Sequence, residues 1–248
     1  MFYKPSPEQR EAYKDLSICI LAPCGGYESP VRFMRSVVNM VAYSWMHGLK
    51  VYQMGNTERT VVDWARNDLA RIAKTKVNEY TGEKFTHLLW LDDDHVFNPD
   101  LALWLVQNAD KDMISALYYG RCDQILPVVY AKGEKEEGEF QHHAIIDIPS
   151  EICEVDAVGF GTLLMRRDVL DRVPEPWFTL DWRSGEDIAF CVAAKKHGVQ
   201  IFLDGRYKIG HMGPRPIVTE KDYIKYMDDH PEIRETKYRV DLSEKRRN

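Results

Sequence analysis

The sequence predicts an α/β fold in which a mainly parallel central sheet is flanked by helices. Three apolar segments, 16–22, 50–54 and 86–91, have the length and composition of buried strands. Helical patterns alternate with them, and this strand-helix-strand order requires the crossover connections that parallel sheets use. Ligands of such sheets bind at the carboxyl ends of the strands. The functional site is therefore expected where these three segments end.

Two amphipathic helices are expected between these strands. The first lies between Pro30, which suits a first helical turn after a capping Ser29, and Gly48, which ends it. The second begins near Thr57 or Thr60, and the apolar residues of both helices recur about every four positions. The predicted buried faces comprise Phe33, Val37, Val41 and Trp45 in the first helix and Val61, Ala65, Leu69, Ile72 and Val77 in the second.

Shorter elements continue the pattern in the rest of the chain. They are a helix over 99–108, strands over 112–117, 153–158 and 162–165, a helical turn over 167–172, a helix over 186–197 and a strand over 200–204. The charged stretch 132–139 is predicted to be a solvated loop or a hairpin tip. The inward face of the helix over 186–197 is expected to comprise Ile188, Ala189, Val192 and Ala193.

Composition and charge argue against several classes of protein. The chain has 39 acidic and 33 basic residues, a formal charge of -6, and so lacks the broad basic field of nonspecific nucleic-acid binders. Its longest apolar runs are far shorter than the ~20 residues that cross a bilayer, and its first residues do not have the pattern of a signal peptide. The five cysteines form no Cys-x-x-Cys pair, which favours a reducing, cytoplasmic location.

Three adjacent carboxylates, Asp92, Asp93 and Asp94, follow the third apolar segment directly. Neighbouring carboxylates repel one another unless a cation or hydrogen-bond donors balance them. Magnesium and manganese prefer oxygen ligands and are commonly held by one or two carboxylates, with substrate phosphates and water in the other positions. The triplet therefore predicts a cation site, and a solvated or helix-capping acidic turn before Asn98 is the alternative.

Two later signals are weaker when each is taken alone. Glu186 and Asp187 begin a predicted helix directly after a glycine, where the helix N-terminus favours carboxylates, and helix capping explains such residues equally well. His211 lies between Gly210 and Gly213 in a segment that allows a ligand to approach the backbone closely. A single histidine can also be structural, so the order of all the motifs carries the interpretation.

In this order of motifs the sequence resembles the glycosyltransferases of the GT-A fold. It is similar to those of family 2. The resemblance covers roughly 16–211. In this family a metal-binding Asp-x-Asp motif, a later Glu-Asp motif and a histidine recur in the same order along the chain. It implies a Rossmann-like, mainly parallel central sheet with a smaller sheet on the acceptor side. It also implies transfer of a sugar from a nucleoside-diphosphate sugar to an acceptor hydroxyl.

The resemblance assigns the metal site to three residues. It implies that Asp94 is a direct metal ligand, that Asp92 contacts the metal or the ribose, and that His211 binds the same ion. The implied cofactor is Mn²⁺ or Mg²⁺, which would bridge the diphosphate of the donor. This agrees with the chemistry, because a divalent cation neutralises the charge that develops on a nucleoside-diphosphate leaving group.

The resemblance also assigns the acceptor side of the site. Asp187 matches the carboxylate that removes the proton of the acceptor hydroxyl in inverting members, with Glu186 as its neighbour and possible replacement. Trp177 and Trp182 lie shortly before this motif, and we expect their rings to bind the acceptor. Packing of these rings in the core or in a lid is the alternative.

On the donor side, Ala22 and Pro23 would lie along the base and the ribose, and Arg66 would approach the nucleotide or its phosphates. Asp93 lies between the two motif aspartates and is expected in the same donor site. Gly161, in the segment Gly-Phe-Gly, would let the backbone approach the donor sugar, and a tight turn between strands is the alternative.

Two departures from the family pattern leave the nucleotide base open. The loop after the first strand reads Pro-Cys-Gly-Gly-Tyr instead of a polar sequence, and no acidic residue clearly follows the second strand, where Asn56 stands. The acceptor is equally open among a saccharide, a small molecule, a protein and a modified nucleobase. The match of Asp187 to the general base of inverting members implies inversion of the anomeric configuration, with retention as the alternative, and the oligomeric state is left open.

Other functions fit parts of the pattern. In a haloacid-dehalogenase-type phosphatase, Asp92 would be the nucleophile and Asp94 the acid or base, although that motif usually follows the first strand of its domain. Nucleotide-sugar pyrophosphorylases expect a basic residue near the first strand, and 24–30 contains no lysine or arginine. A non-catalytic nucleotide-sugar-binding module would keep the fold without turnover.

The length of 248 residues suits one or two domains. The proposed donor half, up to Asp94, and acceptor half, up to His211, contribute to one cleft. We therefore expect a single GT-A-like catalytic domain over 1–213, with 214–248 as a C-terminal helical extension or lid of the same domain.

Overall fold

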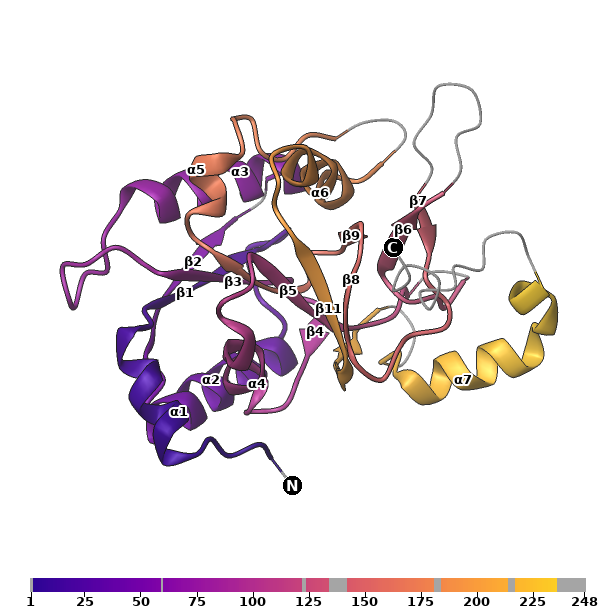
Figure 1. The fold of residues 1–248 in the computed structure, drawn as a ribbon, viewed down its shortest axis with the longest axis horizontal. Coiled ribbons are helices and arrows are strands. Elements are labelled where there is room, and N and C mark those ends of the chain that lie inside the picture. Colours follow the sequence, from indigo (N-terminus) through magenta and orange to yellow (C-terminus); the bar gives the residue numbers. More distant parts are fainter. Residues whose placement is uncertain are drawn as a thin grey trace.

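A seven-stranded sheet forms the centre of the computed structural model, which describes residues 2–58, 60–121, 124–133, 142–180, 184–213 and 217–235 (Figure 1). Its strands are β1 (Ile18–Pro23), β2 (Val51–Thr57), β3 (His87–Leu91), β5 (Met113–Leu117), β8 (Ile152–Glu154), β10 (Thr162–Arg166) and β11 (Ile201–Lys208). Their order is β2-β1-β3-β10-β5-β11-β8. The strands β1, β2, β3, β5 and β11 run in one direction, and β10 and β8 run against them. The predicted mainly parallel sheet is confirmed.

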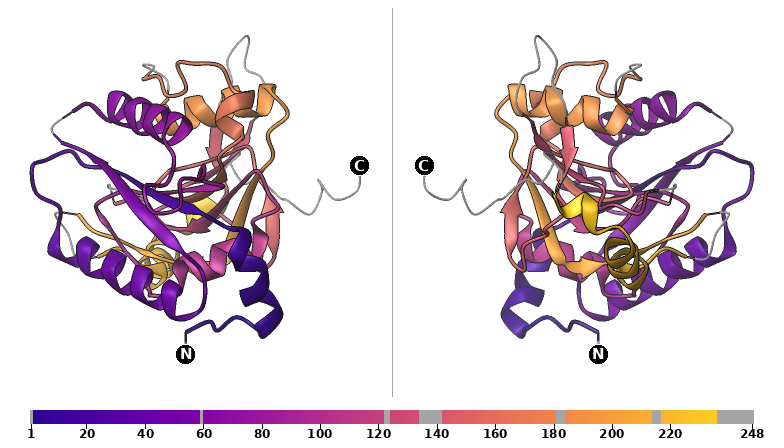
Figure 2. Two further views of the ribbon diagram at one scale, coloured as in Figure 1. Left: turned by 90° about the vertical axis from the view of Figure 1, so that its left-hand side faces the viewer. Right: turned by 90° about the vertical axis from the view of Figure 1, so that its right-hand side faces the viewer.

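Helices cover both faces of this sheet (Figures 1 and 2). One face carries α3 (Val62–Thr75), α5 (Val169–Arg172) and α6 (Glu186–Lys196), and the other carries α1 (Pro7–Ala12), α2 (Val31–Met46) and α4 (Leu101–Leu105). Another helix, α7 (Glu220–Asp229), follows the sheet strands in sequence, and short 3-10 turns span Tyr13–Asp15, Val106–Asn108 and Pro231–Glu235. Within the described ranges, none of the helices combines the length and the apolar character needed to span a bilayer.

The alternation of side chains along β1 explains why its sequence is almost entirely apolar. Cys19 and Leu21 belong to the core beneath α3, α5 and α6, whereas Ile18, Ile20 and Ala22 belong to the core beneath α2 and α4. Successive side chains of a strand point to opposite faces, so a strand with helices on both faces needs apolar residues at every position. The predicted buried strands are confirmed for this reason.

Two small sheets lie beside the large one. A three-stranded sheet has the order β7-β6-β9, with β6 (Val129–Lys132), β7 (His142–Ala144) and β9 (Ala157–Val158). A two-stranded sheet pairs β4 (His95–Val96) with β12 (Gly210–His211). This second pairing places His95 directly opposite His211 although they are far apart in sequence.

The predicted helix faces are only partly correct. In α2, Trp45 is 48% exposed, and Met40 and Ser44 are buried instead. Of the second predicted face, Ile72 is exposed, and so are Val61 and Val77, which lie outside α3. The buried side chains of α3 are Ala65, Arg66, Asn67, Leu69, Ala70 and Ala73. An α-helix has 3.6 residues per turn, so a strict four-residue step drifts away from the buried face after two turns.

Two further expectations need correction. The buried face of α6 comprises Phe190, Cys191 and Ala194, and the residues predicted to face inward, Ile188, Ala189, Val192 and Ala193, are half-buried. Ser29 does not cap α2, because Pro30 is its N-cap and the Ser29 hydroxyl lies 3.4 Å from the Cys24 sulfur. Most of the charged stretch 132–139 lies outside the described residues. The helix α7 lies within 214–248, and the division into a catalytic domain over 1–213 and an extension stays a prediction.

Asn67 on α3 fixes the segment that leads towards α6. Its side-chain oxygen accepts hydrogen bonds from the backbone N–H groups of Trp177 (3.0 Å) and Phe178 (3.2 Å). Its side-chain nitrogen donates to the carbonyls of Phe178 (2.6 Å) and Asp63 (2.8 Å). Because Asn67 is only 7% exposed, water cannot replace these bonds if the side chain is removed.

We predict that Asn67→Ala lowers the free energy of unfolding by about 2–4 kcal/mol, because several buried backbone groups lose their partners. Urea unfolding followed by circular dichroism measures this loss. Asp68→Ala, one position further along α3 with a 61% exposed side chain, is the matched control and should change the stability by less than about 0.5 kcal/mol. Equal losses in the two variants would contradict the role of Asn67.

Candidate functional site

A polar cavity of about 260 Å³ lies where β1 and β3 end. The cavity is lined by Pro23, Cys24, Gly25, Thr60, Val62, Ala65, Arg66, Asp92, Asp93, Asp94, Glu186 and Asp187. Residues from four separate stretches of sequence therefore meet at the carboxyl ends of parallel strands, as the fold class predicts. Seven of the predicted site residues line this one cavity.

The buried guanidinium of Arg66 connects the two acidic motifs. Its Nη2 lies 2.8 Å from Asp92 Oδ1, and its Nε lies 2.9 Å from Glu186 Oε1. The guanidinium also lies over the rings of Trp90 (5.8 Å) and Phe160 (5.4 Å), which attract a cation. Burial alone would lower the pKa of Arg66, but the two carboxylates hold it above its usual value. Arg66 is therefore a permanent positive charge inside the site.

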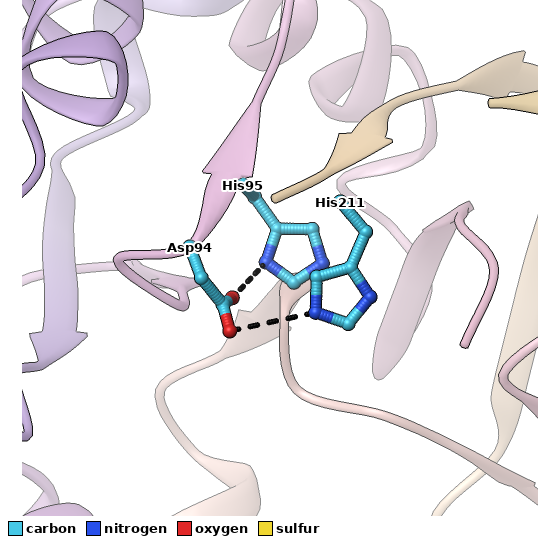
Figure 3. Close-up of side chains that lie close together, drawn as sticks. All are labelled: Asp94, His95 and His211. Atoms are coloured by element: carbon cyan, nitrogen blue, oxygen red, sulfur yellow. Dashed lines mark ion pairs between the residues drawn. The ribbon is translucent and has the colours of Figure 1, made fainter. Parts of the chain in front are cut away.

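Asp94 forms a second cluster with two histidines (Figure 3). Its Oδ1 lies 3.0 Å from His95 Nδ1, and its Oδ2 lies 3.4 Å from His211 Nε2. The pairing of β4 with β12 stacks the two imidazole rings, with centroids 4.4 Å apart and planes inclined by 12°. Although burial works against ionisation, contacts from His211 and His95 hold the pKa of Asp94 well below its usual range. Asp94 is therefore a carboxylate at neutral pH.

This cluster has the properties of a metal-ligand set. One ligand atom from each of Asp94, His95 and His211 lies within 4.8 Å of the others. His211 Nδ1 is 2.8 Å from the carbonyl of Tyr119, which orients the ring and leaves Nε2 directed at Asp94, as outer-shell partners of metal-bound histidines do. Asp94 Oδ1 and His95 Nδ1 have only their ion pair with each other, and His95 Nε2 is buried without a hydrogen bond to any described residue. These residues fit a divalent ion with mixed oxygen and nitrogen ligands.

Gly161 is required by the packing of His95. A Cβ atom at this position would lie 2.4 Å from His95 Cε1, which no real contact allows. The Gly161 backbone N–H also donates to the hydroxyl of Tyr118 (3.2 Å), and its carbonyl accepts from the Asp92 N–H (3.2 Å). The structure thus gives Gly161 a role in placing the metal-ligand cluster, and its predicted contact with a donor sugar stays a prediction.

Unlike its neighbour Glu186, Asp187 forms no ion pair with any residue that the structure describes. Burial and the adjacent charge of Glu186 raise the pKa of Asp187 to about 6, against a smaller opposing effect of Arg66. Its Oδ1 accepts a hydrogen bond from the Ile188 N–H (2.7 Å), which fixes it in the first turn of α6. A carboxylate with a raised pKa is suited to accept a proton near neutral pH.

The middle residue of the acidic triplet, Asp93, faces the loop after β1. Burial and the charges of Asp94 and Asp92 raise the pKa of Asp93, and the thiol of Cys24 interacts with its carboxylate. Cys24 is itself 4% exposed, and burial raises the pKa of its thiol. The two residues form one wall of the cavity.

Some predicted site residues lie elsewhere. Ala22 is buried beneath α2 and does not line the cavity, whereas Pro23 does. Trp177 is 1% exposed and its Nε1 donates to the carbonyl of Val173, so the prediction that its ring binds an acceptor is wrong. The ring was assigned to the site from its proximity in sequence, but it belongs to the core beneath α3. Trp182 lies outside the described residues, as does the side chain of Asn56.

Sequence reasoning missed two residues of the site. His95 follows the acidic triplet directly, and its position was visible, but nothing in the sequence predicts the pairing of β4 with β12 that brings it to His211. Arg121 reaches Asp94 from the segment after β5, and no motif pointed to it. Asp92, predicted as a metal or ribose contact, is held by Arg66 and lies outside the three-residue ligand group.

No protein-family model matches the sequence, and no curated protein matches it. Solved structures do. The crystal structure of A197 from STIV matches with a TM-score of 0.55 and 17% identity, over 84% of this chain and 92% of that one. The crystal structure of GalNAc-T7 with UDP, GalNAc and Mn²⁺ matches with a TM-score of 0.51 and 14% identity, over 92% of this chain and 53% of that one.

The fold is of the GT-A type. At these identities the likeness concerns the fold alone, and this chain spans about half the length of GalNAc-T7.

We predict that Asp187 titrates near pH 6, well above the value of about 4 that is usual for aspartate. Carbon-13 NMR of the aspartate carboxyl groups measures the midpoint, with Asp187→Asn identifying the resonance. Glu186→Gln removes a neighbouring negative charge and should lower the midpoint. The exposed Glu175→Gln is the control and should leave it unchanged. A midpoint near 4, or one that does not respond to Glu186→Gln, would contradict the assignment.

Proposed function

We propose that the protein is a metal-dependent glycosyltransferase that moves a sugar from a nucleoside-diphosphate sugar to an acceptor hydroxyl. The observation that carries the proposal is the ligand group of Asp94, His95 and His211 beside a cavity that also holds Asp187, in a GT-A-type fold. A structural neighbour, GalNAc-T7, was solved with UDP, GalNAc and Mn²⁺, which supports the same class of donor and ion. A hexose is the donor sugar that we expect.

The charge of the cavity supports a bound cation. Five carboxylates line it, and Arg66 is the only basic side chain among its lining residues. A diphosphate would meet strong repulsion in such a cavity unless a cation balanced the carboxylates. A divalent ion held by Asp94, His95 and His211 would supply that balance and would neutralise the leaving diphosphate when the sugar is transferred. Because two of the three ligands are imidazoles, we expect Mn²⁺ to bind better than Mg²⁺.

The donor would lie along the wall formed by Pro23, Cys24 and Asp93. Arg66 Nη1 is buried without a hydrogen bond to any described residue, so we assign this atom to the donor. Asp92 Oδ1 accepts from Arg66, which leaves Oδ2 as the oxygen that we assign to the ribose or the ion. The identity of the base is left to experiment, since the loop after β1 departs from the family pattern.

Asp187 is the residue that we assign as general base. Above about pH 6 its carboxylate can accept the proton of the acceptor hydroxyl while that oxygen forms a bond to the anomeric carbon. The bond from this carbon to the phosphate oxygen then breaks, and the nucleoside diphosphate leaves with the electron pair. Direct displacement of this kind inverts the anomeric configuration. Glu186 is held by Arg66 and is therefore less suited to the role.

The alternatives fit the site less well. A phosphatase nucleophile at Asp92 would need a free carboxylate, whereas Oδ1 of this residue is engaged by a 2% exposed arginine. A non-catalytic binding module would have no use for a carboxylate with a raised pKa beside the cation cluster. Measuring nucleotide binding and turnover separately distinguishes a glycosyltransferase from a non-catalytic binding module.

We predict that Mn²⁺ and a nucleoside diphosphate together stabilise the wild-type protein against heat. A panel of UDP, GDP, CDP, ADP and dTDP identifies the base, and the corresponding nucleotide sugars are then assayed for release of the nucleoside diphosphate. Asp94→Ala should abolish the Mn²⁺-dependent binding. Asp187→Asn should keep it and lose turnover by about 10²–10⁴-fold, as loss of a general base does.

Asp110→Asn is the control, because its side chain is 78% exposed, and it should behave as wild type. Turnover by Asp187→Asn at the wild-type rate would refute the general-base assignment. Binding of the nucleotide at undiminished affinity in EDTA would refute the metal assignment, and binding without any turnover would favour the non-catalytic module.

A further inference from the structure

Arg121 contacts the metal-ligand carboxylate from outside the cavity. Its Nη1 lies 2.9 Å from Asp94 Oδ2 and 2.8 Å from the carbonyl of Met212. The stem of its side chain lies across Gly213, where a Cβ atom would come within 3.1 Å of Arg121 Cδ. The chain thus places a guanidinium on the same carboxylate oxygen that faces His211.

An ion and this guanidinium would compete for one oxygen. An ion bound by Asp94 Oδ2 and His211 Nε2 has to lie within coordination distance of both atoms, which are 3.4 Å apart. A second cation hydrogen-bonded to the same oxygen would be repelled by the ion at short range. The side chain of Arg121 is 41% exposed, and exposed ion pairs contribute little to stability. The guanidinium can therefore leave Asp94 by side-chain rotation without disturbing the core.

The chemistry of the displaced group indicates where it would bind. A guanidinium offers a planar set of donors that matches two phosphate oxygens, and it keeps its charge at any physiological pH. A diphosphate that reaches an ion at Asp94 also comes close to Arg121, because both cations share that carboxylate. Arg66 is not displaced by the ion in this way, because its Nη2 and Nε stay paired with Asp92 and Glu186 and only its Nη1 is left for the donor.

We propose that Arg121 couples the divalent ion to the diphosphate of the donor. It opposes binding of the ion alone by pairing with Asp94, and it binds the diphosphate when the ion takes its place. This inference rests on the proposed function, because it assumes a diphosphate-bearing donor. It makes the ion and the diphosphate bind cooperatively, since each favours the arrangement in which Arg121 has left Asp94.

The test compares the wild type, Arg121→Ala and Arg121→Lys with a matched control. Electron paramagnetic resonance of free Mn²⁺ gives the affinity for the ion alone, and calorimetry at saturating Mn²⁺ gives the affinity for inorganic pyrophosphate, which carries no base. Arg166→Ala is the control, because the Arg166 side chain is also 41% exposed and pairs with Asp168 at 3.0 Å. It should match the wild type in both measurements.

We expect Arg121→Ala to bind Mn²⁺ alone about 3–10-fold more tightly and pyrophosphate about 5–30-fold more weakly than the wild type, in the range of ordinary coupling energies. Arg121→Lys keeps the positive charge but not the planar fork, so its affinity for Mn²⁺ alone should stay closer to that of the wild type while pyrophosphate binding weakens.

Unchanged or weaker binding of Mn²⁺ alone by Arg121→Ala would overturn the competition, and unchanged pyrophosphate affinity would overturn the contact with the diphosphate. Failure of the proposed function gives a different result. In that case the wild type binds Mn²⁺ through Asp94 but binds neither pyrophosphate nor any nucleoside diphosphate, while the Mn²⁺ titration still reports on the competition.

Discussion

The rest of the site depends on one buried ion-pair network, in which Arg66 holds Asp92 with one nitrogen and Glu186 with another. Asp92 directly follows the strand β3 and Glu186 begins the helix α6, so this contact fixes the end of β3 against the start of α6. Without the guanidinium, two motifs of like charge would face each other across a buried space. Removing one partner from a buried network of this kind costs about 3–5 kcal/mol, because the remaining charges stay buried without compensation.

The network also divides the work within each acidic motif. One carboxylate of each motif, Asp92 or Glu186, is bound by Arg66 and kept in place. The other carboxylate is not bound by Arg66: Asp94 contacts the two histidines, and Asp187 keeps a raised pKa beside the cavity. Each acidic motif thus supplies one carboxylate that holds the two segments together and one that remains beside the cavity.

The sequence was informative where a physical rule acts locally. Strands with helices on both faces need continuous apolar runs, so β1 and β3 could be placed, and carboxylates after such strands pointed to the cavity. Contacts between distant segments could not be placed this way. The stacking of His95 on His211 follows from the pairing of β4 with β12, and Trp177 is buried because the segment around it packs on α3. The residues next to His95 and Trp177 in sequence do not predict this stacking or this burial, because both depend on segments that are distant in sequence.

The central claim is that an ion held by Asp94 and the two histidines organises this site. Anomalous diffraction at the manganese absorption edge, from crystals grown with Mn²⁺ and the nucleoside diphosphate that binds best, tests it most directly. The account predicts one strong peak within coordination distance of Asp94 and His211, with Asp92 and Glu186 still paired with Arg66. A site without a peak at saturating Mn²⁺, or a peak held by Asp92 and Asp187 without Asp94, would contradict it.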